Sequence, residues 1–245
     1  MAKRARFLSG PVGLCLCALA LVVACRKLYS LHPLFADADA VLDPRLLGSW
    51  TLDSTESGDR WVFLRIDSTS RSYTLALTDS ATARVLPGID ISSLLQDSAT
   101  MARVRRDPSL RARRTRDSAA VYRLMSDSAG SRVFEVRLGR LAGVLFLDIK
   151  AAPLYGDSRF PHELLLPVHW FWRASLQADR LQVTPLDDDW LGRMIDSGTV
   201  RIAHERVDGS DLVLTAPTDE LQRLIARYAQ DTLAFPRKNA IQLRR

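Results

Sequence analysis

Short β-type segments separated by turn residues constrain the fold of this chain more than any other feature. Three such segments, 46–52, 61–66 and 73–77, are rich in aliphatic and aromatic residues, and Ser57-Gly58-Asp59 and Ser68-Thr69-Ser70 separate them. Aromatic and β-branched residues favour strands, whereas Gly, Asp and Ser are typical of tight turns. This part of the chain is therefore predicted to fold as an antiparallel meander.

Strand-like segments resume after a long interruption. We expect further strands at 120–125, 132–138, 143–149, 164–176, 180–185, 200–207 and 211–215. Segment 164–176 is continuously apolar, which indicates a strand that is covered on both faces. The chain is thus predicted to be mainly β, as an antiparallel barrel or a barrel-like meander of about 8–10 strands.

Two short helices are expected among the strands, because apolar residues recur at helical spacing in 188–196 and 219–230. Thr218 is placed to cap the second helix, whose apolar stripe predicts that it closes one end of the barrel or lies along its flank. Asp187-Asp188-Asp189 invites a metal interpretation but lacks the spacing of a calcium loop. Acidic residues suit the positive end of a helix dipole, so we expect no metal there.

The first 25 residues have the layout of an export signal. A basic start precedes an apolar run from Val12 to Ala24, about 13 residues long, whereas a helix needs roughly 20 to cross a bilayer. Val22-Val23-Ala24-Cys25 resembles the bacterial lipobox, in which the cysteine receives diacylglycerol and becomes the mature N-terminus. Residues 1–24 are therefore predicted to be a lipoprotein signal peptide and Cys25 the lipidation site. The alternative is a conventional signal peptide cut nearby, with Cys25 an ordinary small apolar residue.

The remaining cysteines agree with export, since Cys15 and Cys17 lie inside the predicted signal and none follows Cys25. A domain without disulfides depends on its hydrophobic core, and about 200 residues are enough for one core. We expect the protein at the bacterial cell envelope, anchored in the membrane by lipid on the periplasmic or extracellular side. Its expected parts are a tether at 25–43, a single barrel-like domain at 44–235 with an insertion at 82–118, and a C-terminal tail at 236–245.

Positive charge is concentrated in the insertion. The whole chain carries +6, and seven arginines against Asp107 and Asp117 give Met101 to Asp117 a local excess of +5. These arginines are Arg103, Arg105, Arg106, Arg111, Arg113, Arg114 and Arg116. Such a stretch could lie on anionic headgroups beside a lipid anchor, or it is a solvated, partly helical loop. It contains no aromatic residue to stack on bases, so no nucleic-acid partner is expected.

The sequence contains no catalytic motif that we recognise. It has no Gly-x-Ser-x-Gly turn, no glycine-rich phosphate loop, and no mature thiol besides Cys25. His162-Glu163 with His169 superficially resembles a zinc motif, but residues seven apart on an extended chain point to opposite faces. We expect no cofactor, no metal and no enzymatic activity; a hydrolase with dispersed catalytic residues is the enzymatic alternative.

Aromatic residues of the expected strands are the candidate ligand site. Those that would line a cavity in the barrel are Trp50, Trp61, Phe146, Trp170 and Trp172. Trp170 and Trp172 share one face of their segment, whereas His169 and Arg173 lie on the other. Filling of the barrel interior is the ordinary role of such residues and remains the alternative.

Leu47-Gly48-Ser49-Trp50 resembles the Gly-x-Trp opening strand of lipocalin-like barrels. A wider resemblance is to uncharacterised bacterial lipoproteins, which have a lipobox cysteine, a segment like Ser30 to Phe35 and an Asp-Pro-x-Leu-x-Gly-x-Trp entry, here 43–50. Similar features recur at 145–148, 166–169, 186–191 and 214–222, so the likeness covers most of the mature chain, and the Arg-rich insertion departs from the pattern.

The resemblance implies the fold and the localisation of the protein, and it assigns no catalytic residue. We therefore expect a lipid-anchored envelope protein with a lipocalin-like domain that binds a hydrophobic or amphipathic ligand or an envelope partner. The alternative is a structural or interaction module of the envelope with a packed interior.

Overall fold

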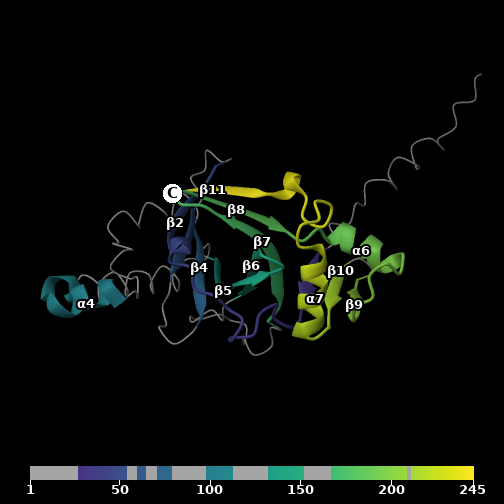
Figure 1. Cartoon of the computed structure of the whole chain (residues 1–245), viewed down its shortest axis with the longest axis horizontal. Helices are drawn as coiled ribbons and strands as arrows, with labels where there is room; N and C mark the ends of the chain where they lie inside the picture. Colours follow the sequence, from purple (N-terminus) through teal and green to yellow (C-terminus); the bar gives the residue numbers. More distant parts are fainter. Residues whose placement is uncertain are drawn as a thin grey trace, which may run out of the picture.

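Eight antiparallel strands close into a barrel in the computed structural model, which describes residues 27–53, 60–64, 71–78, 98–112, 132–151, 167–208 and 211–245 (Figure 1). The barrel strands are β2 (Gly48–Leu52), β3 (Arg60–Leu64), β4 (Ser72–Thr78), β5 (Arg132–Leu141), β6 (Val144–Ala151), β7 (His169–Leu176), β8 (Arg180–Pro185) and β11 (Ile241–Arg244). β6 pairs with β7, and β11 pairs with both β8 and β2, which completes the closure. The predicted mainly β, antiparallel barrel is confirmed.

Strand register divides the side chains between the inside and the outside of the barrel. Trp50 lies opposite Trp61, and Leu147 lies opposite Trp172, so these four residues share the inner face. The buried inner residues form one hydrophobic cluster that includes Trp50, Trp61, Phe63, Tyr73, Leu75, Val136, Leu138, Leu147, Ile149, Leu181, Val183 and Leu243. This cluster is the core of the barrel.

A second layer covers one outer side of the barrel. It consists of β1 (Leu28–Ser30), β9 (His204–Val207), β10 (Asp211–Leu214), α6 (Asp188–Asp196) and α7 (Thr218–Tyr228), drawn to the right of the barrel in Figure 1. Phe146 and Phe171 point outward from β6 and β7 and pack with this layer in a separate hydrophobic cluster. As expected from its continuous apolarity, β7 is therefore covered on both faces.

Residues 27–43 belong to the segment that the sequence predicted to be a tether able to dock on the domain, and they form a strap that packs across the barrel. β1 runs parallel to β10 and meets β7 where Ser30 lies opposite His169. Further along, the Val41 N–H donates to the Leu138 carbonyl at 2.7 Å, and Leu34 is fully buried. Local apolarity at Leu28 to Phe35 was visible in the sequence, but its partners lie more than 100 residues away.

The segment 236–245, which the sequence predicted to be a tail, instead completes the barrel. It holds a short 3-10 helix, η4 (Arg237–Asn239), and β11. In β11, Leu243 lies opposite Leu181 of β8 on one side and Leu52 of β2 on the other. A four-residue strand has too little alternation to be recognised locally, and its pairing with β2 is long-range.

The helices of the outer layer largely follow the sequence expectation. α6 occupies the predicted range, and the Asp187 carboxylate caps it by accepting from the Trp190 N–H at 2.7 Å. α7 begins at Thr218 rather than after it, and the Thr218 hydroxyl donates to the Pro33 carbonyl at 2.8 Å instead of capping the helix. α7 lies along the flank of the barrel.

The described part of the insertion is helical. α4 (Ser98–Arg106) is followed by helical residues 108–112, and Figure 1 shows α4 to the side of the barrel, apart from the second layer. The strand expected at 120–125 and most of 82–118 lie outside the described residues. Of the strand expected at 200–207, only His204–Val207 is extended.

Among the described residues, no helix combines the length and apolarity that crossing a membrane requires.

Candidate functional site

The middle of the barrel is filled by aromatic side chains. The ring centroids of Trp61 and Trp172 lie 5.5 Å apart, and those of Trp61 and Phe63 lie 6.4 Å apart. Trp50 is fully buried, and its indole N–H donates to the Leu46 carbonyl at 2.8 Å. Of the predicted ligand residues, Trp50 and Trp61 therefore belong to the packed core.

A pocket of about 300 Å³ lies where β7 begins and β8 ends, and we call it the tryptophan pocket. Its apolar walls include Leu28 and Tyr29 from β1, Trp170 and Trp172 from β7, and Pro185 from β8. The last paired residue of β8 is Pro185, which lies opposite Trp172. Trp170, two residues earlier on β7, therefore has no paired neighbour on β8. Both tryptophans are only partly buried, in contrast to Trp50 and Trp61.

The aromatic rings of the tryptophan pocket come from different elements. The ring of Trp170 lies 5.7 Å from that of Tyr29 and 6.2 Å from that of Phe134, measured between centroids. These tilted and edge-on contacts hold the Trp170 indole in position from two sides. The strap therefore supplies one wall of the pocket, and the barrel supplies the other.

Charged and polar groups also line the tryptophan pocket. They include Lys27, Asp187, Asp188 and Asn239, and the Asn239 side-chain amide donates to Asp187 Oδ2 at 3.3 Å. Partial burial raises the pKa of Asp188, and the neighbouring carboxylates of Asp189 and Asp187 raise it further. An apolar wall with a few charged groups suits a molecule that has a hydrophobic part and a polar end.

A buried acid–imidazole pair lies under the strap, on the outer face of the sheet. The His169 Nδ1 atom is 2.7 Å from Asp148 Oδ1, and the Leu34 N–H donates to Asp148 Oδ2 at 2.8 Å. Asp148 is 2 % exposed and His169 is 7 % exposed. Through these two contacts, the pair connects β6, β7 and the strap.

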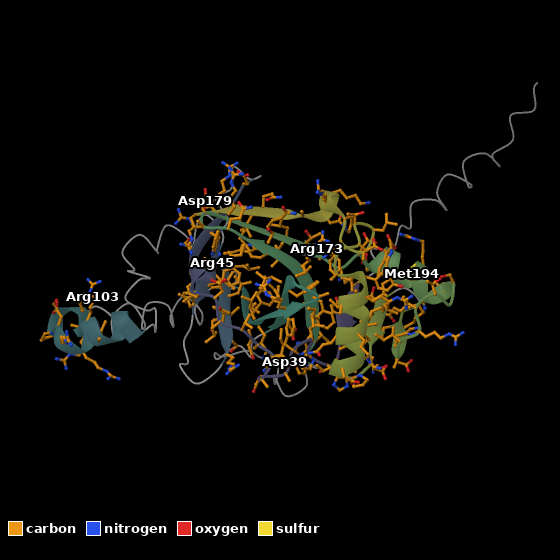
Figure 2. All side chains as sticks on the ribbon, in the orientation of Figure 1. Asp39, Arg45, Arg103, Arg173, Asp179 and Met194 are labelled. Carbon is orange, nitrogen blue, oxygen red and sulfur yellow. The ribbon has the colours of Figure 1, made fainter. Side chains whose placement is uncertain are left out.

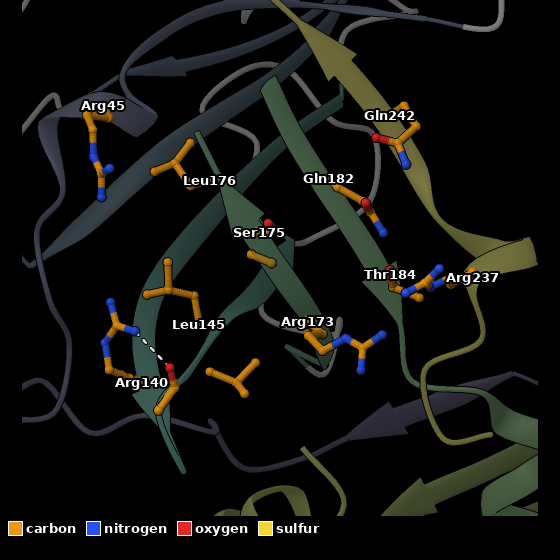
Figure 3. Close-up of a pocket in the computed structure, with 13 residues that line it drawn as sticks. Arg45, Arg140, Leu145, Arg173, Ser175, Leu176, Gln182, Thr184, Arg237 and Gln242 are labelled. Carbon is orange, nitrogen blue, oxygen red and sulfur yellow. Dashed lines mark hydrogen bonds between the residues drawn. The ribbon is translucent and has the colours of Figure 1, made fainter. Parts of the chain in front are cut away.

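A larger, polar pocket of about 730 Å³ lies elsewhere on the barrel, and we call it the arginine pocket. Among the described residues that line it, the charged ones are Arg45, Arg140, Arg173 and Arg237 (Figure 3). Hydroxyl and amide side chains from β7, β8 and β11 lie between them: Ser175, Gln182, Thr184 and Gln242. No acidic residue is among the described residues that line this pocket.

The structure separates Phe146 from the other predicted ligand residues. Phe146 lies opposite Arg173 of β7 and faces outward, where its ring centroid is 5.6 Å from that of Phe235. The stretch Val144 to Ile149 is apolar on both faces, so the sequence alone could not tell inner from outer positions.

The predicted membrane-surface arginines lie on the insertion where they are described. Arg103, Arg105 and Arg106 on α4 and Arg111 after it are all exposed, and Figure 2 shows Arg103 far from Arg45 and Arg173 of the barrel. The remaining predicted positions, Arg113, Arg114, Arg116 and the lipidation site Cys25, lie outside the described residues.

Within the described ranges, no group of three or more His, Cys, Asp or Glu is arranged to hold a metal ion.

No family model, curated protein or solved structure matches this chain.

Sequence reasoning missed Tyr29 and the four arginines of the arginine pocket. Tyr29 lies in the predicted tether, and its aromatic ring, four residues after Cys25, is the one sequence signal for a site there. The arginines come from η1 (Pro44–Leu46), β5, β7 and η4, and no sequence pattern connects positions this far apart.

Proposed function

We propose that this protein is a lipid-anchored component of the bacterial cell envelope that binds a hydrophobic or amphipathic small molecule in the tryptophan pocket. The observation that carries the proposal is the partial exposure of Trp170 and Trp172 beside Tyr29, in a barrel whose other indoles are buried. Covering partly exposed aromatic surface is favourable by about 25 cal/mol per Å². A ligand seated there gains affinity without displacing the core.

The position of Cys25 supports a membrane-derived ligand. Leu28 of the pocket wall is the third residue after Cys25, and three extended residues span at most about 10 Å. A lipid attached to Cys25 would keep this pocket close to the bilayer surface. An amphipathic molecule could then reach the pocket directly from the membrane.

Lipid attachment is tested by metabolic labelling with radioactive palmitate. Wild type is expected to incorporate label, and Cys25→Ala is expected to abolish it and leave an unprocessed precursor. Cys17→Ala is the matched control, because this cysteine lies in the segment predicted to be removed and its loss should leave labelling intact. Equal labelling of wild type and Cys25→Ala would contradict the proposed anchor.

In this proposal, the exposed arginines of the insertion contact anionic headgroups beside the anchor, each adding up to about 1 kcal/mol. A chain that begins at Arg26, and so lacks both the signal and the lipid, should bind phosphatidylglycerol vesicles and not phosphatidylcholine vesicles. Replacing Arg103, Arg105, Arg106 and Arg111 by Gln should lower this binding strongly. Unchanged binding would assign the four side chains to ordinary solvent-exposed positions.

A second candidate is an interaction module of the envelope, and the packed centre of the barrel favours it. The rings of Trp61 and Trp172 pack against each other 5.5 Å apart within the barrel core, as the side chains of a filled interior do. Native mass spectrometry of the protein purified from its membrane distinguishes the two. A co-purifying small molecule supports the ligand-binding function, and a ligand-free barrel that takes up no fluorescent fatty acid supports the interaction module.

A further inference from the structure

The arginine pocket differs chemically from the tryptophan pocket. It is polar, positively charged and more than twice as large. Its volume of about 730 Å³ lies in the range typical of small-molecule sites. Figure 3 shows Arg45 and Arg140 on one side of it and Arg173 and Arg237 on the other. The inference that follows does not depend on the proposed function.

The charges of the arginine pocket are only partly compensated. Arg45 pairs with Asp43 at 2.6 Å, and Arg140 acts on the same carboxylate, whose pKa both arginines help to lower. On the opposite side, Asp231 acts on Arg173, as does the like charge of Arg237. Four arginines therefore share two nearby carboxylates, which leaves about two positive charges without a counterpart.

Arg173 is held rigidly at the base of the pocket. Its guanidinium donates to the Phe235 carbonyl at 2.9 Å and to the Ala229 carbonyl at 3.3 Å, and it lies over the Phe235 ring. Burial lowers the pKa of Arg173, and the neighbouring charge of Arg237 lowers it further. A guanidinium remains protonated under all ordinary conditions, so an anion bound here relieves an existing electrostatic cost.

Thr184 provides an independent indication of a ligand. It lies directly opposite Arg173 on the neighbouring strand, lines the pocket and is only 2 % exposed. Among the described residues, its hydroxyl has no hydrogen-bond partner. A buried hydroxyl without a partner is costly, and a bound acceptor would remove this cost.

The uncharged polar side chains of the arginine pocket suit a ligand that carries hydroxyl groups in addition to its charge. Ser175 lies opposite Gln182, which lies opposite Gln242, so the three form a row across β7, β8 and β11. Amide groups both donate and accept hydrogen bonds, as hydroxyl groups do. A phosphate monoester carries nearly two negative charges at neutral pH, which matches the uncompensated charge of the pocket.

We propose that the arginine pocket binds a phosphorylated polyol, with the phosphate between Arg173 and Arg237 beside the Thr184 hydroxyl and the polyol hydroxyls on Gln182 and Gln242. A free polyol phosphate presents this group as a monoester, and a phospholipid headgroup presents the same polyol on a phosphodiester, which carries one negative charge. Arginine is the side chain best suited to phosphate, because its planar donors match the phosphate oxygens.

The test is isothermal titration calorimetry of the full chain, purified in detergent, with glycerol phosphate as the probe and glycerol as the neutral control. Glycerol phosphate should bind, more weakly as salt rises, and glycerol should not. Arg237→Gln, which alters an exposed side chain, should reduce the affinity by at least about tenfold. Thr184→Val keeps the shape of the side chain, removes the unpartnered hydroxyl and should also reduce it without loss of stability.

Arg193→Gln is the matched control, because Arg193 is an exposed arginine of α6 outside the pocket. Dihexanoyl phosphatidylglycerol, used as a monomer, is the second probe. If this lipid alone binds in an Arg237-dependent way, the site takes a lipid headgroup. If glycerol phosphate binds in an Arg237-dependent way, the site takes a free polyol phosphate. Equal losses in Arg237→Gln and Arg193→Gln, or no Arg237-dependent binding of either probe, would overturn the proposal.

Discussion

The indole rings of Trp61 and Trp172 meet 5.5 Å apart across the barrel, although β3 and β7 stand on opposite sides of it. Trp61 belongs to the packed core, whereas the partly exposed Trp172 also lines the tryptophan pocket. Tryptophans on the same inner face therefore differ in burial: Trp61 is buried in the core, and Trp170 is partly exposed in the tryptophan pocket.

The first prediction concerns this division. Trp61→Ala should lower the free energy of unfolding by about 3–5 kcal/mol, because it opens a cavity in the packed centre. Trp170→Ala should cost clearly less, because its side chain is partly exposed in the pocket. Urea unfolding followed by circular dichroism measures both, and equal losses would show that Trp170 is an ordinary core residue.

A second prediction tests the buried pair of Asp148 and His169. Asp148→Ala should destabilise the fold by about 3 kcal/mol or more, since it leaves the Leu34 N–H and the His169 ring without their acceptor. The control is Asp219→Ala, whose partner Arg223 is 72 % exposed, and it should change stability by no more than about 0.5 kcal/mol. A negligible effect of Asp148→Ala would contradict the role of this pair in holding the strap.

A third prediction concerns the contact of the strap with β5. A Cβ atom added at Gly139 would collide with the ring of Phe35, so only glycine allows the strap to pack here. Gly139→Ala should cost about 1–3 kcal/mol through overpacking. Combining it with Phe35→Ala should give less than the sum of the two single effects, because both changes act on one contact. Additive losses in this double-mutant cycle would show that the two positions are independent.

A fourth prediction follows from the lowered pKa of Asp43, whose main cause is the hydrogen bond from the Arg45 side chain. Because the folded-state pKa lies below the unfolded value of about 3.8, ionised Asp43 stabilises the fold above that pH, and the contribution is lost as the pH falls through the folded-state pKa. Asp43→Asn should be less stable than wild type at neutral pH, by a small amount because Arg45 is exposed. The difference should shrink below pH 3.8, and a constant difference from neutral to acid pH would exclude this linkage.

Much of the barrel could be predicted from local patterns, as β3, β4 and α6 show. Each has its own periodicity and its own turn or capping residues, such as Asp187 before α6. β1 and β11 could not be predicted, because three or four residues give no reliable period and their partners lie far away in the sequence. The strap contacts of Phe35 and the closure of the barrel could not be predicted either, because they too join residues that lie far apart in the sequence.

The candidate sites were predictable only in part. Trp170 and Trp172 were recognised as sharing a face, which the register confirms. The outward direction of Phe146 could not be predicted, because its segment is apolar on both faces. The arginine pocket depends on the meeting of η1, β7 and η4, and only the closed barrel brings these elements together.

The most direct test of the central claim is photo-crosslinking with a fatty acid that carries a diazirine group, followed by peptide mapping. We predict saturable labelling that is confined to peptides containing residues 27–29 and 169–172. The substitutions Trp170→Ala and Trp172→Ala should each greatly reduce this labelling. Labelling that does not saturate, or that maps elsewhere on the barrel and is unchanged in both variants, would contradict a ligand site in the tryptophan pocket.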